Sequence, residues 1–396
     1  MAAKYQLITE LYRRTGIAVA KNPQAWQGFL SSACRNYKCR FDEQLLIYAQ
    51  RPDAVAVAKL ETWNRQFKRW VNKDSKGIAV FDPKGRRNTL KYYFDVSDTH
   101  EGYYGSRPVP IWQMDERYEQ AVMERLSDRF GDVESTDLAS DLMETAKNAV
   151  EDNLQDYFSQ LKDCTKDSFL EELDDFNIEV IYRRLATNSV AFMLISRCGL
   201  DTNEFFDRED FADIVNFNTP ATINAIGVAT SDIAEMALRE ISQSIRNVQI
   251  AEKDRIAPLH KKRRLSMIKA DNNPKGANTM SEITYSRQGD YLIPDLTLPT
   301  EPELPLGRYA LMHRDYLEKH KRVTYLNLLT SGRLNGHLHE VEQTALQRLE
   351  LLTKQLSAEQ GVTEELKEKA PMQWVGLMNN IRSQAEEVIL TELIYK

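Results

Sequence analysis

Residues 41–58, FDEQLLIYAQRPDAVAVA, change from a helical pattern to a strand pattern within one short stretch. In 41–50 the apolar side chains recur at a helical period, with Leu45, Leu46, Tyr48 and Ala49 as its members. Pro52 interrupts that pattern, and the VAVA run at 55–58 favours a strand because it is short and partly β-branched. The stretch therefore predicts an α+β unit.

The same strand pattern recurs on the C-terminal side, and helices follow it. IAVF at 78–81 and LKYYFDV at 90–96 predict two more strands, with a basic hairpin tip at 86–88. From Met114 onward helical periods dominate. We expect helices over 118–130, 137–150, 169–176, 187–198, 205–211, 220–250, 309–320, 324–329, 334–357, 363–369 and 372–393. A hairpin around 288–290 completes the prediction of a mainly α fold with a small β-sheet.

The length of 396 residues predicts two or three domains. Changes in pattern divide the chain into a basic α+β head (1–113), an acidic helical middle (114–251), a basic linker (252–280) and a hairpin plus helical bundle (281–396). A hydrophobic content of 42% and a charged content of 28% argue against wholesale disorder. The first residues lack the apolar core of a signal peptide, so we expect a cytoplasmic protein with no membrane partner.

The net charge of −7 conceals strongly charged segments. Residues 1–100 hold 18 Lys/Arg and 9 Asp/Glu, a net +9, whereas 101–252 hold 13 and 31, a net −18. Residues 253–280 carry +6 and residues 281–396 carry −4. Because electrostatic fields decay within about 10 Å at physiological salt, the charge of each segment decides its partners. The positive charge of the head therefore favours binding to phosphate groups.

No motif for catalysis is recognisable. The histidines of GHLHE (336–340) lie two apart, so on a helix they face different sides, unlike the i,i+4 pair of HExxH. The acidic run 171–175 lacks the glycine and spacing of a calcium loop. The four cysteines form no CxxC pair, and there is no P-loop, GxGxxG or GxSxG. We expect no enzyme, no catalytic residue, no metal and no cofactor.

The segment 63–77, WNRQFKRWVNKDSKG, interleaves aromatic rings with cations. Single-stranded nucleic acid requires this combination, because cations meet phosphates and flat rings stack on unpaired bases. The alternative is that both tryptophans anchor a core and the cations form an ordinary solvated face. The predicted nucleic-acid-binding residues are Trp63, Arg65, Lys68, Arg69, Trp70, Lys73, Lys76, Arg86 and Arg87. Further stacking platforms are predicted at Tyr37, Tyr48, Tyr92 and Tyr93.

The stretches 41–54 and 70–83 (WVNKDSKGIAVFDP), with Trp63 between them, resemble the N-terminal domain of ArdC antirestriction proteins. The chain over about 20–250 also resembles the N-terminal region of large helicase/methylase-like proteins of Firmicutes conjugative elements, through LLIYAQRPDA, DSFLEELDDFN and TNSVAFMLISRCG. The ArdC resemblance implies single-stranded DNA binding. Gln44 stands at the polar position of the ArdC helix, and the ArdC HExxH and the helicase and methylase motifs are absent, so no catalytic module is implied.

Residues 283–396 resemble the transposon-encoded protein TnpV. The matching pieces are GDYLIPDLTLP (289–299), KRVTYLNLLTSGRL (321–334), QWVGLMNNIR (373–382) and TELIY (391–395). This resemblance implies a mobile genetic element as the context and supplies no mechanism.

Two functions of different classes follow. The first is a DNA-binding accessory or antirestriction-type protein of a mobile element, which binds single-stranded DNA or, less favoured, RNA. The second is a protein-binding inhibitor of a host defence nuclease, anti-CRISPR-like, in which the acidic region 114–251 imitates nucleic acid. A remnant with folded but idle modules is the third alternative.

Overall fold

A computed structural model of the chain describes residues 2–82, 89–103, 105–131, 137–256, 285–288, 291–294 and 306–396. Helices dominate, and the strands form small antiparallel sheets, which confirms the predicted mainly α fold with a small β-sheet. None of the helices in these ranges is long and apolar enough to cross a membrane.

The head combines three helices of at least 10 residues and the one-turn helix α4 (Leu60–Thr62) with two small sheets. Antiparallel pairing places the strands in the order β1-β4-β3, and a separate two-stranded ribbon joins β2 to β5. The elements are α1 (Ala2–Val19), α2 (Pro23–Ala33), α3 (Phe41–Gln50), β1 (Val57–Lys59), β2 (Arg69–Val71), β3 (Ile78–Asp82), β4 (Thr89–Asp95) and β5 (Thr99–Glu101).

The first strand begins two residues later than the sequence predicts. The carboxylate of Asp95 accepts hydrogen bonds from the backbone N–H groups of Val55 and Ala56, at 2.8 and 2.9 Å. A side chain therefore takes the place of a strand partner at this point, because buried backbone groups must be paired somewhere. The predicted hairpin tip at 86–88 lies outside the described residues.

Four long helices form the body beside the head: α5 (Glu116–Phe130), α6 (Leu138–Lys162), α7 (Asp175–Cys198) and α8 (Pro220–Ile256). Asp115, Asp137 and Asp174 cap the first three, each accepting a hydrogen bond from a backbone N–H of the first turn. Gly199 ends α7 with φ +81°, the left-handed conformation that glycine adopts freely. A Cβ at Gly227 would lie 2.2 Å from the Phe41 ring, so this glycine lets α8 approach α3 closely.

The structure contradicts two of the predicted helices. Residues 169–173 form turns. Just before them Asp167 has φ 63°, and the Ser168 hydroxyl accepts from the N–H of Leu170. The region of 205–211 contains the 3₁₀ helix Glu209–Asn216 instead, and the Asp207 carboxylate accepts from the N–H of Glu209. In both places polar side chains bond to nearby backbone and compete with the helical pattern.

The C-terminal part contains the hairpin β6 (Tyr285–Gln288) and β7 (Tyr291–Pro294), then helices. These are α9 (Arg308–His320), α10 (Arg322–Thr330), α11 (Leu334–Glu359), α12 (Glu364–Lys369) and α13 (Pro371–Ile389), which ends in the π-helical turn Leu390–Ile394. The helix α8 continues to Ile256, into the predicted linker 252–280, whose remainder lies outside the described residues.

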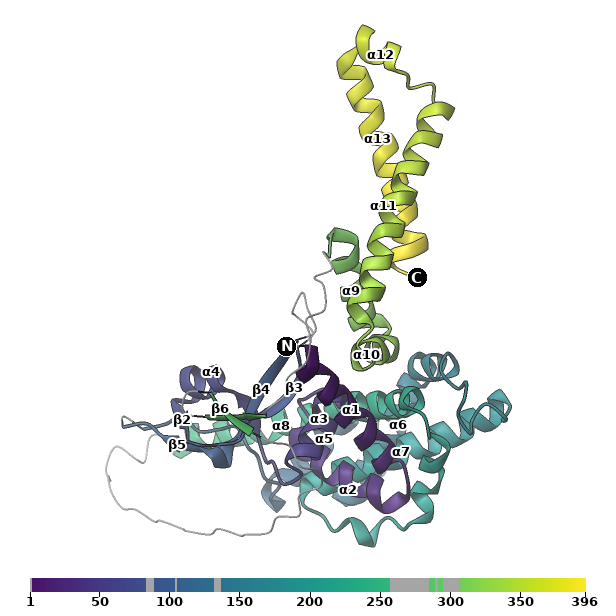
Figure 1. Ribbon diagram of the computed structural model, residues 1–396. Helices are drawn as coiled ribbons and strands as arrows, with labels where there is room; N and C mark the ends of the chain where they lie inside the picture. Colours follow the sequence, from purple (N-terminus) through teal and green to yellow (C-terminus); the bar gives the residue numbers. More distant parts are fainter. Residues whose placement is uncertain are drawn as a thin grey trace.

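The C-terminal part is fastened to the rest of the chain through α10 and the hairpin. The Tyr5 hydroxyl donates to the Leu329 carbonyl at 2.6 Å, and the Asn224 amide donates to Asn327 Oδ1 at 2.6 Å. The backbone N–H of Gly77 donates to the Leu292 carbonyl at 3.0 Å, so β7 continues the head. From this base, α11 and α13 extend away from the body as a two-helix arm (Figure 1).

One cluster of buried hydrophobic side chains contains residues from Tyr5 to Leu338 and so includes parts of the head, the body and α9–α11. A smaller cluster is formed by Trp63, Val71 and Phe94, with Tyr291 of the hairpin against it. The division into the domains 1–113, 114–251, 252–280 and 281–396 stays a prediction, because independent folding of each part is a matter for experiment.

Candidate nucleic-acid interface

The two-stranded ribbon β2–β5 positions the centre of the basic-aromatic segment. Antiparallel pairing sets Arg69 opposite Glu101, Trp70 opposite His100 and Val71 opposite Thr99. Because side chains alternate along a strand, Val71 points into the small core with Phe94, whereas Trp70 lies on the other face. The alternation thus separates one buried and one exposed side of the segment.

Trp63 belongs to the buried side. Its side chain is 1% exposed, and its indole N–H donates to the Phe94 carbonyl at 2.9 Å. It lies at the start of the π-helical turn Trp63–Phe67, after which Lys68 adopts φ 54°. The prediction that Trp63 offers its ring to a base is therefore wrong: this ring anchors the small core.

Trp70 is on the exposed side, with 48% of its surface accessible. Its indole lies against the backbone of Gly102, where an added Cβ would meet Trp70 Nε1 at 2.7 Å. Glycine at 102 therefore lets the indole approach the backbone just after β5, while about half of the ring surface stays exposed. Beside it, His100 Nδ1 is 2.7 Å from Asn72 Oδ1, which gives the ribbon a polar edge.

The cations of the segment differ in how firmly they are held. Arg69 is half-buried: its guanidinium donates to Thr99 Oγ1 at 2.7 Å and to the Thr99 carbonyl at 2.9 Å, and lies 3.6 Å from Glu101. It fastens the ribbon and has little left to offer a ligand. The exposed cations within six residues of Trp70 in the sequence are Arg65, Lys68, Lys73 and Lys76. Arg86 and Arg87 lie outside the described residues.

The four predicted tyrosine platforms are not gathered beside Trp70. Tyr37 is buried, with its hydroxyl accepting from the Trp112 indole at 3.2 Å, so its predicted stacking role is wrong. Tyr48 is half-buried and packs edge-on against Phe29. Tyr92 and Tyr93 on β4 are half-buried against the main core, and the Tyr93 hydroxyl donates to Glu43 at 3.1 Å.

Sequence reasoning missed Tyr103 and Arg107. Tyr103 follows Gly102 and is 97% exposed, the largest fraction among the exposed large hydrophobic side chains of the described chain. Arg107 is exposed, and its backbone N–H donates to the Phe67 carbonyl at 2.7 Å, which brings this loop back to the segment. The sequence feature that could have indicated both residues is GYYGSR at 102–107, in which aromatic residues and an arginine accompany two glycines.

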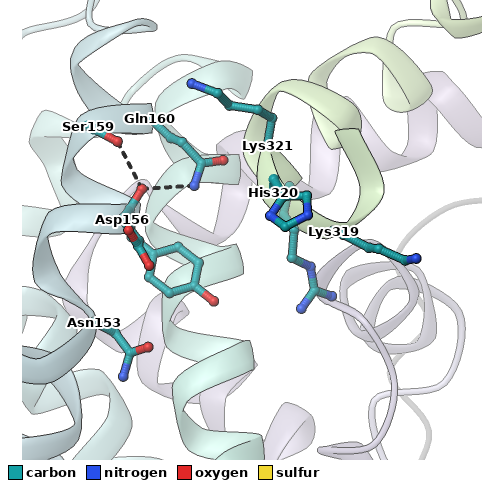
Figure 2. A pocket seen from close by; sticks show the side chains of 9 residues that line it. Asn153, Asp156, Ser159, Gln160, Lys319, His320 and Lys321 are labelled. Atoms are coloured by element: carbon teal, nitrogen blue, oxygen red, sulfur yellow. Dashed lines mark hydrogen bonds between the residues drawn. The ribbon is translucent and has the colours of Figure 1, made fainter. Parts of the chain in front are cut away.

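A second polar site lies between α6 and the corner that joins α9 to α10 (Figure 2). It is a cavity of about 350 Å³, lined by Asn153, Asp156, Tyr157, Ser159, Gln160, Lys319, His320, Lys321 and Arg322. Asp156 and His320 lie on opposite walls, and Lys319 points away from α6 (Figure 2). Gln160 is fixed, because its Oε1 accepts from the backbone N–H of Val323 at 3.0 Å.

One charge of this cavity, that of Arg322, is paired within the protein. Arg322 lies 2.7 Å from the buried carboxylate of Asp232, which also accepts from the Tyr157 hydroxyl at 3.0 Å. Burial raises the pKa of Asp232 to about 6, and Arg322 and Tyr157 oppose that rise. With Asp156 on the facing wall, the cavity contains charges of both signs, whereas four exposed cations lie within six residues of the exposed Trp70 in the sequence.

Comparison with known proteins identifies one part of the chain. No curated protein and no solved structure matches it. Residues 284–394 match the family described as transposon-encoded protein TnpV. The matched segment comprises the hairpin, α9 to α13 and the final π-helical turn. The C-terminal part is therefore TnpV-like, and the protein is transposon-associated.

Proposed function

We propose that the protein is a non-catalytic accessory of a transposon-type mobile element that binds single-stranded DNA through the ribbon face. This face consists of Trp70 and Tyr103 with the cations Arg65, Lys68, Lys73, Lys76 and Arg107. The observation that carries the proposal is the exposed Trp70 ring, held on Gly102, with four exposed cations within six residues of it in the sequence.

The chemistry favours an unpaired strand over a duplex. An exposed ring gains about 1–3 kcal/mol when it stacks on a base, and only an unpaired base offers its whole face. Tyr103 adds a second exposed ring one residue beyond the glycine that supports Trp70. Lys and Arg beside the rings neutralise phosphates, which gives affinity for any sequence. The proposed ligand is therefore single-stranded DNA bound without sequence preference, and RNA is the related alternative.

The proposal is tested by fluorescence anisotropy with a labelled 20-nucleotide single strand, the matching duplex and the matching RNA. Trp70→Ala should weaken single-strand binding by about 5- to 150-fold, which corresponds to about 1–3 kcal/mol of lost stacking. The matched control is Phe176→Ala, which removes another exposed ring from an acidic surface and should leave the affinity unchanged. Equal affinities of Trp70→Ala and the wild type would exclude the ribbon as the binding face.

A second candidate function is inhibition of a host defence nuclease through the acidic body. The observation in its favour is two exposed rings, Phe169 at 62% on the segment that joins α6 to α7 and Phe176 at 74% in the first turn of α7. The residues between them include Glu171, Glu172, Asp174 and Asp175. Carboxylates around exposed rings match a basic, nucleic-acid-binding groove in both charge and stacking, so this surface supports the mimic hypothesis.

The same variants separate the two functions when DNA cleavage by a restriction endonuclease and by a CRISPR nuclease is measured with added protein. Inhibition by the mimic should be lost in Phe176→Ala and in Glu172→Lys, and should be retained in Trp70→Ala. Protection through DNA binding should instead be lost in Trp70→Ala and retained in Phe176→Ala and Glu172→Lys. Retained inhibition in both Phe176→Ala and Glu172→Lys would exclude the acidic surface as the inhibitory site.

A further inference from the structure

The short helix α10 lies at the base of the arm and packs against α1, α6 and α8 (Figure 1). It has 9 residues, and its N-cap residue makes no side-chain capping bond. Helices this short are marginal on their own, and the end groups of a helix need partners. At the N-terminal end, Gln160 of α6 accepts from the N–H of Val323 at 3.0 Å. At the C-terminal end, the Tyr5 hydroxyl of α1 donates to the Leu329 carbonyl at 2.6 Å. Both ends of α10 are therefore bonded to helices far away in the sequence.

The middle of α10 contacts a buried asparagine of α8. The side chain of Asn224 is 1% exposed, its amide donates to Asn327 Oδ1 at 2.6 Å, and its own Oδ1 accepts from the Tyr12 hydroxyl at 2.7 Å. A buried amide that loses its partner costs free energy, so these hydrogen bonds select which residue of α10 faces α8. The apolar residues Leu326 and Leu329 of α10 belong to the same buried cluster as residues of the head and the body. Apolar burial thus holds α10 in place, and the hydrogen bonds set its register.

Charge also matches across this contact. Arg322, the first residue of α10, lies 2.7 Å from Asp232 of α8, whose side chain is 5% exposed. The corner KHKR at 319–322 is basic, whereas residues 101–252 carry a net −18. Charge complementarity of this kind favours one arrangement of two surfaces over others. The surface of α1, α6 and α8 that receives α10 is called the α10 site and is defined by Tyr5, Gln160, Asn224 and Asp232.

The hairpin makes a second contact between the TnpV-like part and the head. Leu292 of β7 donates its N–H to the Ser75 carbonyl at 3.1 Å, and its carbonyl accepts from the N–H of Gly77 at 3.0 Å. Addition of a strand to an exposed backbone edge is a common way in which one chain binds another. Because the hairpin and α10 belong to one part of the chain, binding at either contact favours binding at the other.

We propose that the α10 site is a docking surface for a TnpV-like chain and that it binds this partner without a covalent connection. The contacts described above join residues before 257 to residues after 284, and none of them involves the residues between. The site selects its partner by charge and register: Asp232 requires a cation at the first residue of the docked helix, and Asn224 requires an amide oxygen five residues later. The segment matched to the TnpV family, 284–394, contains both. The TnpV-like part is therefore a protein-docking module, whether or not the ribbon face binds DNA.

The experiment cuts the full chain after it has folded. A recognition sequence for a site-specific protease is inserted after Asn273, in the predicted linker, and a fluorophore is attached to a peptide tag at the C-terminus. After complete cleavage, light scattering at about 5 µM should still give one species near the chain mass of 45.7 kDa. Anisotropy of the fluorophore during dilution to about 10 nM then gives the dissociation constant of the two pieces. Pieces that separate at about 5 µM overturn the proposal.

Two variants of the cleavable chain test the α10 site itself. Arg322→Glu places a carboxylate against the buried Asp232 and should raise the dissociation constant about 10- to 100-fold. Tyr5→Phe removes a single hydroxyl and should raise it about 2- to 10-fold, because the Leu329 carbonyl loses a hydrogen bond.

The matched control is Arg382→Glu, which makes the same change of net charge at an exposed position of α13. It should leave the dissociation constant within about twofold of the wild-type value. Circular dichroism of the uncut proteins should give equal helix content, so that weaker docking is not confused with unfolding. Dissociation constants that stay at the wild-type value in both Arg322→Glu and Tyr5→Phe would overturn the α10 site as the docking surface.

Discussion

The β2–β5 ribbon and the outer half of the arm both expose large apolar side chains, and they differ in what surrounds those side chains. Trp70 on the ribbon has four exposed cations, Arg65, Lys68, Lys73 and Lys76, within six residues of it in the sequence. Met372 and Val375 on the arm lie in eleven residues, 371–381, without any charge. Exposure alone therefore does not identify a partner. The charge around an exposed ring or methyl group does, because it decides whether an ion or another apolar face is the favourable neighbour.

The ribbon offers the sharpest internal comparison, since two tryptophans lie seven residues apart. Trp63→Ala should lower the free energy of unfolding by about 3–5 kcal/mol, because a buried indole and its hydrogen bond are lost. Trp70→Ala should change it by no more than about 0.5 kcal/mol, because the ring is half exposed. Urea denaturation followed by circular dichroism measures both. Equal losses in the two variants would mean that Trp70 is a structural residue after all.

Salt should weaken binding at the ribbon. If four of the exposed cations contact phosphates, raising the salt from about 50 to 200 mM should weaken single-strand binding roughly 50-fold, since the slope is about −0.7 per contact. Anisotropy at the two salt concentrations measures this change. An affinity that does not change with salt would contradict the proposed phosphate contacts.

Acid should weaken the base of the arm, with the smallest effect of the three. His313 Nε2 lies 3.3 Å from His337 Nε2, and His313 Nδ1 lies 2.8 Å from the Ile394 carbonyl. Burial and the neighbouring His313 lower the pKa of His337 below its usual 6.5. The contribution of neutral His337 to the stability of the folded chain is therefore fully present above pH 6.5. It is lost as the pH falls through the lower folded-state pKa of His337.

The melting temperature should accordingly decrease between pH 7.5 and 5.5, and His337→Gln should reduce that dependence. A variant that keeps the full slope would show that other groups cause it. The affinity for single-stranded DNA, and its loss in Trp70→Ala, should both stay the same over this pH range. The reason is that lysine and arginine remain charged and tryptophan does not titrate.

Local pattern predicted most of the fold because helical and strand periods are properties of neighbouring residues. The helices at 309–320 and 334–357 and the strands at 78–81 and 90–96 agree closely with α9, α11, β3 and β4. The failures at 169–176 and 205–211 have a common cause: polar side chains of Asp167, Ser168 and Asp207 lie in turns or bond to nearby backbone. The spacing of apolar residues gives no information on such side chain–backbone hydrogen bonds.

The candidate site was predicted only in outline. The segment 63–77 contains the exposed ring and its cations, but the sequence could not tell Trp63 from Trp70, since both are tryptophans among cations. Tyr103 and Arg107 were missed because they reach the site through the pairing of β5 with β2 and a backbone contact to Phe67, neither of which a linear pattern reveals.

The sequence by itself determined the helical and strand segments, the basic head beside an acidic middle, the TnpV-like C-terminal part and the charge-free stretch at 371–381. Each of these depends on residues that are close together in the chain. Only the tertiary structure decided which tryptophan is buried, that β7 continues the head, and that α13 stands in an arm with its face uncovered. The physical reason is that burial depends on contacts between distant segments, and a side chain's availability to a partner follows from that burial.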